Sequence, residues 1–224
     1  MAGEEDKLDD FYTTIKSGNT TVSNFLEKYE CIFGFIHSEG LTEDYRLGSG
    51  RVKKLRDEVS PVARFVRKFA APADRISFAL DDKTPDCFVT HGGSRRRKIE
   101  VTVAQGRERF NVMRELNQTG TGRGFLGLSD DAPTDHFKER MNQPRTAYSA
   151  EEIGRTLIFA LAICARKKSK FTGDTLLIDA PLETLPPNRW DDFWEPLANE
   201  VEKLTFDEVY VTGRSNQEIC RRIK

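Results

Sequence analysis

Two carboxylate side chains stand at mirrored positions in the segment 85–105, PDCFVTHGGSRRRKIEVTVAQ. If residues 92–94 form the turn between two antiparallel strands, Asp86 lies directly opposite Glu100, with Cβ atoms about 5 Å apart. Two like charges at that distance destabilise a sheet unless a cation lies between them. Mg²⁺ or Mn²⁺ suits the position, because Mg²⁺ takes one or two carboxylates and leaves its other positions to water and phosphate oxygens. The pair therefore predicts a divalent-metal site.

Alternation along the two expected strands divides the hairpin into an apolar face and a polar face. The apolar face carries Cys87, Val89, Ile99, Val101 and Val103, and the polar face carries Asp86, Glu100 and Thr102. A plainer interpretation stays open beside the metal site. In it, Asp86 begins a strand next to a turn, where aspartate is common, and Glu100 faces solvent.

Basic side chains are concentrated around the same hairpin. Residues 92–123 hold eight Arg and Lys against three Glu, although the whole chain has a net charge of −1. The turn is followed by four of them, Arg95, Arg96, Arg97 and Lys98, a cluster suited to the phosphates of a nucleic-acid backbone. The balanced total excludes a protein coated with positive charge, and a solvated charged face is the alternative interpretation of the cluster.

The composition is that of a globular domain rather than of a membrane or disordered chain. At 224 residues, with 38% hydrophobic and 32% charged residues, the chain is long enough for one large domain with an appendage. Its longest strongly apolar run, LIFALAICA, is far shorter than the roughly 20 residues that span a bilayer. The four cysteines form no CxxC pair, and the acidic N-terminus does not resemble a signal peptide. We therefore expect a cytoplasmic protein with no membrane partner.

Hydrophobic periodicity predicts a mixed α/β chain. Helices are expected within 1–36 and over 51–71, 106–117, 150–165 and 189–204. Pro61 predicts either a kink in the second of these or a fresh start with Ser60 as its N-cap. Strands are expected over 75–80, 86–91, 98–104, 174–180 and 207–213. The last two strands are apolar throughout and joined by a helix, which indicates buried, parallel pairing. Residues 37–50 and 118–147 are expected to be a loop and an irregular insertion.

The element order and the hairpin together resemble the PD-(D/E)xK superfamily, the fold of many restriction and repair nucleases. Pro85-Asp86 matches the Pro-Asp of its second core strand, and Glu100-Val101-Thr102 stands where its (D/E)xK lies. The resemblance covers about residues 51–180. It implies a restriction-endonuclease-like mixed sheet with the order α-β-β-β-α-β, here followed by a further α-β. Residues 1–50 would form an N-terminal helical extension, and 51–224 the nuclease-like domain with its insertion at about 118–147.

The sequence departs from the superfamily pattern at the lysine position, which Thr102 occupies. A hydroxyl cannot supply the positive charge that orients a water nucleophile, so the resemblance implies that another residue does this work. Gln105 is a candidate for positioning water, and Lys98 shares the strand face of Glu100. Arg107 and Arg109 on the following segment are candidates for the missing charge. In the superfamily an acidic residue of the first core helix often joins the metal ligands, and Glu58 is the candidate here.

Three hypotheses follow for function. The first is an Mg²⁺- or Mn²⁺-dependent nuclease acting on DNA, with Asp86 and Glu100 as metal ligands and with phosphate contacts from Arg95, Arg96, Arg97, Lys98, Arg107, Arg109 and Arg123. The second is a catalytically inactive protein of the same fold that binds nucleic acid or a protein partner, with Thr102 as the trace of lost chemistry. The third places residues 174–208, which hold ten acidic and two basic side chains, together with the N-terminal helices, at a subunit interface of a homo-oligomer or larger complex.

Overall fold

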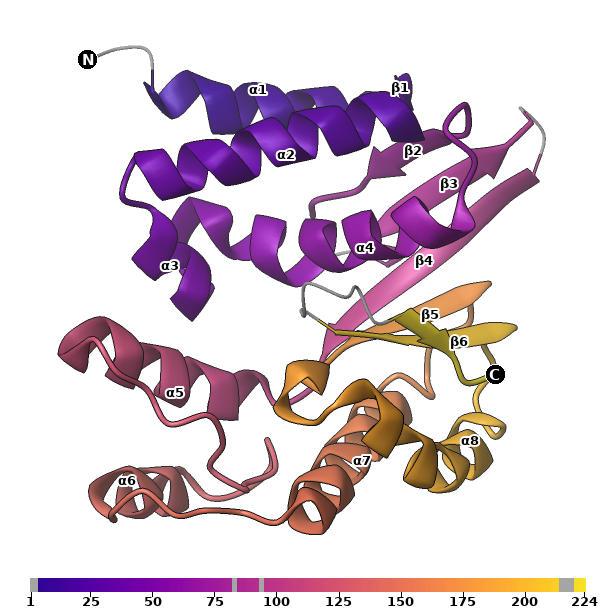
Figure 1. The fold of residues 1–224 in the computed structure, drawn as a ribbon. Helices are drawn as coiled ribbons and strands as arrows, with labels where there is room; N and C mark the ends of the chain where they lie inside the picture. The colour runs from indigo at the N-terminus through magenta and orange to yellow at the C-terminus, as the bar shows by residue number, and fades with distance from the viewer. Residues whose placement is uncertain (1–3, 82–83, 93–94, 214–219) are drawn as a thin grey trace.

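A mixed sheet of seven strands is the centre of the computed structural model, which describes residues 4–81, 84–92, 95–213 and 220–224 (Figure 1). The strands lie in chain order across the sheet: β1 (Thr20–Thr21), β2 (Arg75–Phe78), β3 (Cys87–His91), β4 (Arg95–Val103), β5 (Thr175–Asp179), β6 (Glu208–Thr212) and β7 (Cys220–Arg222). Strands β1 to β4 pair antiparallel, β4, β5 and β6 pair parallel, and β7 returns antiparallel. The sequence prediction of an α/β class is confirmed.

The hairpin of β3 and β4 has the register that the sequence predicted. Cys87 pairs with Ile99 and His91 with Arg95, which places Asp86 next in line opposite Glu100. The predicted turn at 92–94 falls partly outside the described residues. The predicted parallel pairing of the late strands is also confirmed, because Thr175 of β5 pairs with Ile99 of β4 and with Glu208 of β6.

The N-terminal helices cover one face of the sheet (Figure 1). They are α1 (Glu4–Lys16), α2 (Val22–Ser38), a π-helical turn (Leu55–Val59) and α4 (Ser60–Phe69). Their apolar sides meet the alternate strand residues Cys87, Val89, Ile99, Val101, Leu177 and Tyr210 in one buried cluster. Residues 4–50 therefore share a hydrophobic core with the strands of the 51–224 region.

The opposite face of the sheet packs against the C-terminal helices. Helix α7 (Ala150–Lys167) starts at a capping box, in which the Ser149 hydroxyl and the Glu152 carboxylate each accept a hydrogen bond from the other residue's backbone N–H. With α8 (Trp194–Val201) it encloses a second cluster that includes Leu176, Ile178, Val209 and Val211 of the strands. Because both faces of the sheet are covered at β5 and the second half of β4, a charged residue there, such as Glu100, is buried.

Several predicted boundaries are wrong in an instructive way. The expected loop 37–50 contains α3 (Thr42–Leu47), and the expected irregular insertion 118–147 contains α6 (Thr134–Asn142). Both helices have fewer than three turns, so their apolar periodicity is too brief to stand out. The expected helix 189–204 is two elements, a 3₁₀ segment (Pro187–Asp192) and α8, because Pro196 is accepted only in the first turn of a helix.

The start of α4 differs from the predicted cap. Ser60 is the first residue of α4 rather than its N-cap, and its hydroxyl donates to the Leu55 carbonyl 2.7 Å away across the π-helical turn. Pro61 lies in the first turn, where its missing N–H costs nothing. Helix α5 (Gly106–Thr119) follows β4 as predicted. Within the described residues, none of the helices combines the length and the apolar character that a bilayer crossing requires.

Candidate functional site

The carboxylates of Asp86 and Glu100 occupy the middle of the sheet. Asp86 precedes β3, and its Oδ2 accepts a hydrogen bond of 2.7 Å from the Val101 N–H of the neighbouring strand. Glu100 is buried, with 4% of its surface exposed. Its Oε1 accepts a hydrogen bond from Lys168 Nζ, and its Oε2 has no hydrogen-bond partner among the described residues. The site thus holds a buried oxygen with unused capacity to accept a proton or a cation.

Burial and like charge act together on Asp86. Burial is the main cause that raises the pKa of the Asp86 carboxyl to about 7, and the negative charges of Glu100 and Glu58 raise it further. The Val101 N–H and the Lys168 ammonium act in the opposite direction without cancelling the shift. The positive charge near the Asp86 carboxylate is therefore too small to offset its burial and the neighbouring negative charges.

Glu58 belongs to the same electrostatic neighbourhood. It lies in the π-helical turn Leu55–Val59, where its Oε1 forms an ion pair of 3.4 Å with Lys54 one turn earlier. Its negative charge is the smallest of the three causes that raise the pKa of Asp86, so Glu58 acts on Asp86 electrostatically.

Lys168 is the site residue that sequence reasoning missed. It is the C-cap of α7, and its side chain is 20% exposed while its Nζ holds Glu100. The run RKKSK at this helix end complements the helix dipole, and that pattern alone does not indicate a contact with Glu100. The available signal was topological: a basic helix end just before β5 must lie beside β4 once the two strands pair in parallel.

The donor set suits a hard divalent cation held by few protein ligands. Within 4–81, 84–92, 95–213 and 220–224, no group of three or more His, Cys, Asp or Glu side chains is placed to hold a metal ion. Two carboxylates are nevertheless the usual protein share of an Mg²⁺ site, because the ion keeps water in its other positions. Glu100, whose buried Oε2 has no hydrogen-bond partner among the described residues, and Asp86, whose negative charge is not compensated by its surroundings, fit that requirement.

Thr102 and Gln105 lie beyond the carboxylate pair along the chain. Thr102 is half-buried and pairs with Ile178 of β5. Gln105 is buried with 1% exposed surface, and its Nε2 donates to the Leu128 carbonyl at 3.4 Å. Its backbone has φ of 54°, a left-handed conformation that a residue with a Cβ seldom adopts. Gln105 thus belongs to the turn from β4 into α5 and lines a separate cavity.

Three of the predicted phosphate-binding arginines have structural partners. Arg97 bonds Thr175 Oγ1 at 2.7 Å and pairs with Glu208. Arg107 and Arg123 each bind several groups of the 118–147 segment. Arg107 donates to the carbonyls of Asp130 and Ala132 and to the Thr134 hydroxyl, and Arg123 pairs with Glu115 and donates to the carbonyls of Arg140 and Met141. These three side chains are therefore engaged in hydrogen bonds and ion pairs within the protein.

The remaining basic residues divide between the surface and the cavity. Arg95, Arg96 and Lys98 are exposed, and the Arg96 guanidinium lies 3.5 Å from the centre of the Phe88 ring. Arg109 is instead largely enclosed, with 14% of its side chain exposed, and its Nη1 lies 3.9 Å from Asp179. Only the exposed group is placed to meet a long polyanion.

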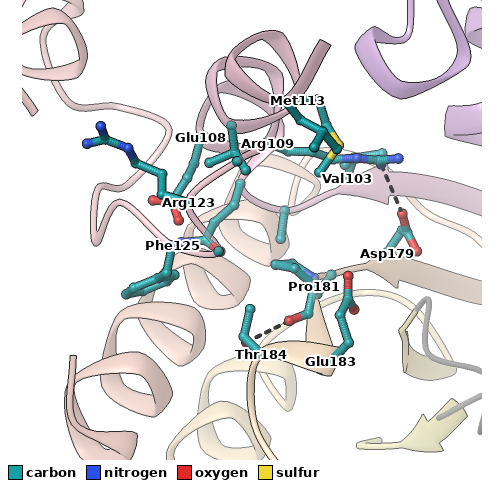
Figure 2. A pocket seen from close by; sticks show the side chains of 17 residues that line it. Val103, Glu108, Arg109, Met113, Arg123, Phe125, Asp179, Pro181, Glu183 and Thr184 are labelled. Atoms are coloured by element: carbon teal, nitrogen blue, oxygen red, sulfur yellow. Dashed lines mark hydrogen bonds and ion pairs between the residues drawn. The ribbon is translucent and has the colours of Figure 1, made fainter. Parts of the chain in front are cut away.

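A cavity of about 530 Å³ opens at the carboxyl ends of β4 and β5 (Figure 2). Its walls come from α5, from residues 122–125 and from residues 179–184. Figure 2 shows Arg109 reaching toward Asp179 on one side, with Phe125 on the other. In sheets of this kind, ligands commonly bind outside the carboxyl ends of parallel strands.

Comparison of the chain with protein-family models, with curated proteins and with solved structures found no match in any of the three.

Proposed function

We propose that this protein is a divalent-metal-dependent nuclease of the PD-(D/E)xK type that hydrolyses phosphodiester bonds in DNA. The observation that carries the proposal is the placement of Asp86, just before β3, opposite Glu100 of β4, together with a buried Glu100 Oε2 that has no hydrogen-bond partner among the described residues. The raised pKa of Asp86 supports it, since a bound cation would remove the cause of that shift.

The order of elements supports the same assignment. Helix α4 is followed by the antiparallel strands β2, β3 and β4, then by α5, α6 and α7, and by β5 parallel to β4. With α5 and α6 set aside as an insertion, this order resembles the α-β-β-β-α-β order of the superfamily core, with Pro85-Asp86 just before the second of its strands and Glu100 on the third. The α8–β6 unit extends that core on the β5 side.

The proposed chemistry uses the carboxylates and one lysine. Bound Mg²⁺ or Mn²⁺ would be held by Asp86 and Glu100, and would lower the pKa of a water molecule and neutralise charge on the scissile phosphate. Lys168 supplies the positive charge that Thr102 cannot, because its Nζ already contacts the Glu100 carboxylate. From there the ammonium orients the attacking water and stabilises negative charge on phosphate oxygens.

The exposed cations give the substrate its path to the site. Arg95, Arg96 and Lys98 are on the strand that carries Glu100, and each adds a charge suited to backbone phosphates. Lys98 lies two residues before Glu100 on the same face of β4. DNA contacting these side chains would lie along the strand that carries Glu100, whose own side chain is buried.

The test is metal-dependent cleavage by the full chain. Linear and single-stranded DNA are incubated with Mn²⁺, with Mg²⁺ or with EDTA, and cleavage is followed on denaturing gels. We expect cleavage with either metal, no cleavage in EDTA, and at least a hundredfold loss in Glu100→Gln and Asp86→Asn. Glu151→Gln is the matched control, because Glu151 is 63% exposed at the far end of α7. Equal activity in all three variants, or activity in EDTA, would refute the proposal.

The ion pair between Lys168 and Glu100 favours a second candidate, a nuclease-fold protein that binds DNA without cleaving it. In this case Lys168 permanently neutralises Glu100 and takes the place of the metal. Such a protein would bind DNA with strong salt dependence but would show no Mn²⁺ binding by calorimetry. Metal binding that both carboxylate substitutions abolish decides in favour of the enzyme.

A further inference from the structure

The sheet has an open face at β2, β3 and the first half of β4. Alternate residues of these strands point toward the N-terminal helices and belong to the first buried cluster. The residues between them point to the opposite side, where the second cluster takes residues from β5 and β6 and, among the described residues, from neither β2 nor β3. Figure 1 shows α7 and α8 next to β5 and β6, away from β2 and β3.

The sheet register gives the open face a regular arrangement. Its residues form two cross-strand rows, Arg75–Thr90–Arg96 and Ser77–Phe88–Lys98. The next row along the strands holds Asp86 opposite Glu100. Successive rows are two residues apart along each strand, or about 7 Å. The open face therefore extends up to the carboxylate pair that we propose as the metal site.

The charge of this face suits a polyanion. Arg75, Arg96 and Lys98 are exposed, and the six residues of the two rows include no acidic side chain. Asp174 adjoins the rows, where its carboxylate accepts the Lys98 backbone N–H at 2.8 Å. The whole chain has a net charge of −1, so these cations form a local feature rather than part of a basic coat. A local group of this kind attracts a chain of phosphates.

Two accessible phenylalanines lie near the carboxylate pair. Phe88 is half-buried in the row beside it, and the Arg96 guanidinium lies 3.5 Å from the centre of the Phe88 ring. Phe171 is 38% exposed, and Lys168 Nζ, which donates to Glu100, is 5.1 Å from the centre of its ring. Unpaired bases stack on aromatic rings and on arginine guanidinium planes, whereas the bases of a duplex already stack on one another.

The carboxylates lie below the surface that a nucleic acid would contact. Glu100 is 4% exposed, while Arg96 and Lys98 in the neighbouring rows are exposed. A duplex is stiff over the length of this face, because its persistence length is about 50 nm. An unpaired strand bends within a few nucleotides and can bring one phosphate into a recess. The recessed carboxylates and the accessible rings thus favour the same form of DNA.

We infer that the open face of β2, β3 and β4 binds single-stranded DNA, with a base stacked on the layered pair of Arg96 and Phe88 and with the backbone continuing to Asp86 and Glu100. The inference rests on the proposed nuclease function and deepens it, since it makes an unpaired strand the substrate. A duplex would meet the exposed cations with its phosphates but would place no base on the Arg96–Phe88 pair.

The experiment is fluorescence anisotropy on the full chain in EDTA with three labelled DNAs of about 12 nucleotides. They are a thymidine strand, an abasic strand of tetrahydrofuran units, and the thymidine strand paired with its complement. We expect the thymidine strand to bind at least ten times more tightly than either of the others. Phe88→Leu and Arg96→Lys, which remove the ring and the guanidinium plane, should each weaken its binding about tenfold and leave the abasic strand unaffected.

Matched variants separate stacking from charge and from folding. Phe88→Tyr retains the ring and should retain binding. Phe159→Leu should bind as the wild type does, because Phe159 is 53% exposed on α7 and about 13 Å along the helix from Lys168. Lys98→Gln should lower the slope of log K against log salt by about 1 for all three DNAs while keeping the preference for the thymidine strand. Circular dichroism and thermal unfolding verify the fold of every variant.

The inference is overturned if the duplex or the abasic strand binds as tightly as the thymidine strand. It is also overturned if folded Phe88→Leu and Arg96→Lys bind the thymidine strand as the wild type does.

Failure of the nuclease proposal is a separate result. Preferential binding of the thymidine strand in EDTA without DNA cleavage in Mn²⁺ refutes the enzyme and keeps the binding face. Cleavage that depends on Glu100, is equal for duplex and single strand, and does not change in Phe88→Leu keeps the enzyme and refutes the binding face.

Discussion

Two aspartates at strand ends illustrate two ways of burying a carboxylate in one sheet. Asp179 ends β5 with 1% of its surface exposed, and Arg64 at 2.5 Å and Arg109 at 3.9 Å supply opposite charge. Asp86 precedes β3, accepts one backbone N–H from Val101, and lies near the negative charge of Glu100. Burial raises the pKa of both carboxyls. For Asp179 the largest opposing effect is the attraction to Arg64, whereas for Asp86 it is the hydrogen bond from the Val101 N–H.

The difference separates a carboxylate with arginine partners from a pair of carboxylates whose charge is only partly compensated. The Asp179 cluster satisfies itself and joins α4 to the edge of β5, with the Arg64 Nε also donating to Thr212 Oγ1 at 3.3 Å. The negative charge of the Asp86 and Glu100 pair is compensated only in part, by the Lys168 ammonium that donates to Glu100. A buried ion pair is costly to break, whereas an uncompensated pair of like charges gains stability when a cation arrives.

The largest expected effect is the loss of the Asp179 carboxylate. Asp179→Ala leaves Arg64 buried without its counter-charge, and we expect a loss of about 3–5 kcal/mol in the free energy of unfolding. Asp86→Ala, which relieves repulsion, should change stability by under about 1 kcal/mol at pH 8. Urea unfolding of both variants at pH 8 in EDTA makes the measurement. Equal destabilisation by the two substitutions would remove the distinction between the two sites.

A pH series sharpens the contrast at Asp86. The folded-state pKa of about 7 lies above the ordinary value of 3.8, so the folded protein binds more protons between those values. Its stabilising contribution is complete below about pH 4 and is lost as the pH rises through 7. We therefore expect the stability of Asp86→Asn minus that of wild type to be larger at pH 8 than at pH 4, by on the order of 1–3 kcal/mol in the free energy of unfolding.

Urea unfolding of wild type and Asp86→Asn in EDTA, from pH 4 to pH 8, tests this expectation. The asparagine keeps an oxygen to accept the Val101 N–H, so the comparison isolates the charge. Parallel stability curves for the two proteins would show that the Asp86 carboxyl titrates normally. Glu108, whose pKa burial also raises to about 7, is present in both proteins and cancels in the difference.

Lys168 gives the contrast a test with two opposite readouts. As the cation on Glu100 it competes with a metal ion for the carboxylate, while in the proposed reaction it orients water. Lys168→Met should therefore bind Mn²⁺ several-fold more tightly by calorimetry and cleave DNA at least tenfold more slowly, about 1.4 kcal/mol of transition-state stabilisation. Tighter binding with unchanged cleavage would assign Lys168 to charge balance alone, and weaker metal binding would contradict the competition.

The hairpin shows what sequence could predict here and the lysine shows what it could not. The period of two residues along a strand and the central turn determine which side chains oppose each other, so the register of Cys87 with Ile99 follows from local pattern. Lys168 is 68 residues from Glu100 in the chain. Its contact depends on where the end of α7 meets the sheet, which is set by packing of the whole crossover rather than by neighbouring residues.

The basic cluster contains one error that the strand pattern itself could have prevented. Four consecutive cations after the turn suggested one phosphate-binding surface, but alternation puts Arg97 on the face of Ile99 and Arg96 on the face of Glu100. Arg97 accordingly lies over the Phe65 ring and pairs with Glu208. Arg109 and Arg123, by contrast, are enclosed by a segment whose path no local pattern determines.

The smallest expected effect extends the comparison from carboxylates to arginines. Arg96 is exposed and its guanidinium lies over Phe88, so Arg96→Gln should leave stability within about 0.5 kcal/mol of wild type and reduce the slope of log K against log salt for DNA by about 1. Arg97→Gln should lower stability and leave the salt slope unchanged, because Thr175 loses a hydrogen bond and Glu208 keeps only its ion pair with Arg222, while no phosphate contact is removed. Fluorescence anisotropy with labelled DNA, at about 50 to 200 mM salt, measures the salt slope. Urea unfolding measures the change in stability. If Arg97→Gln alone changed the salt slope, the alternation argument would fail, because the buried arginine and not the exposed one would be meeting the phosphates.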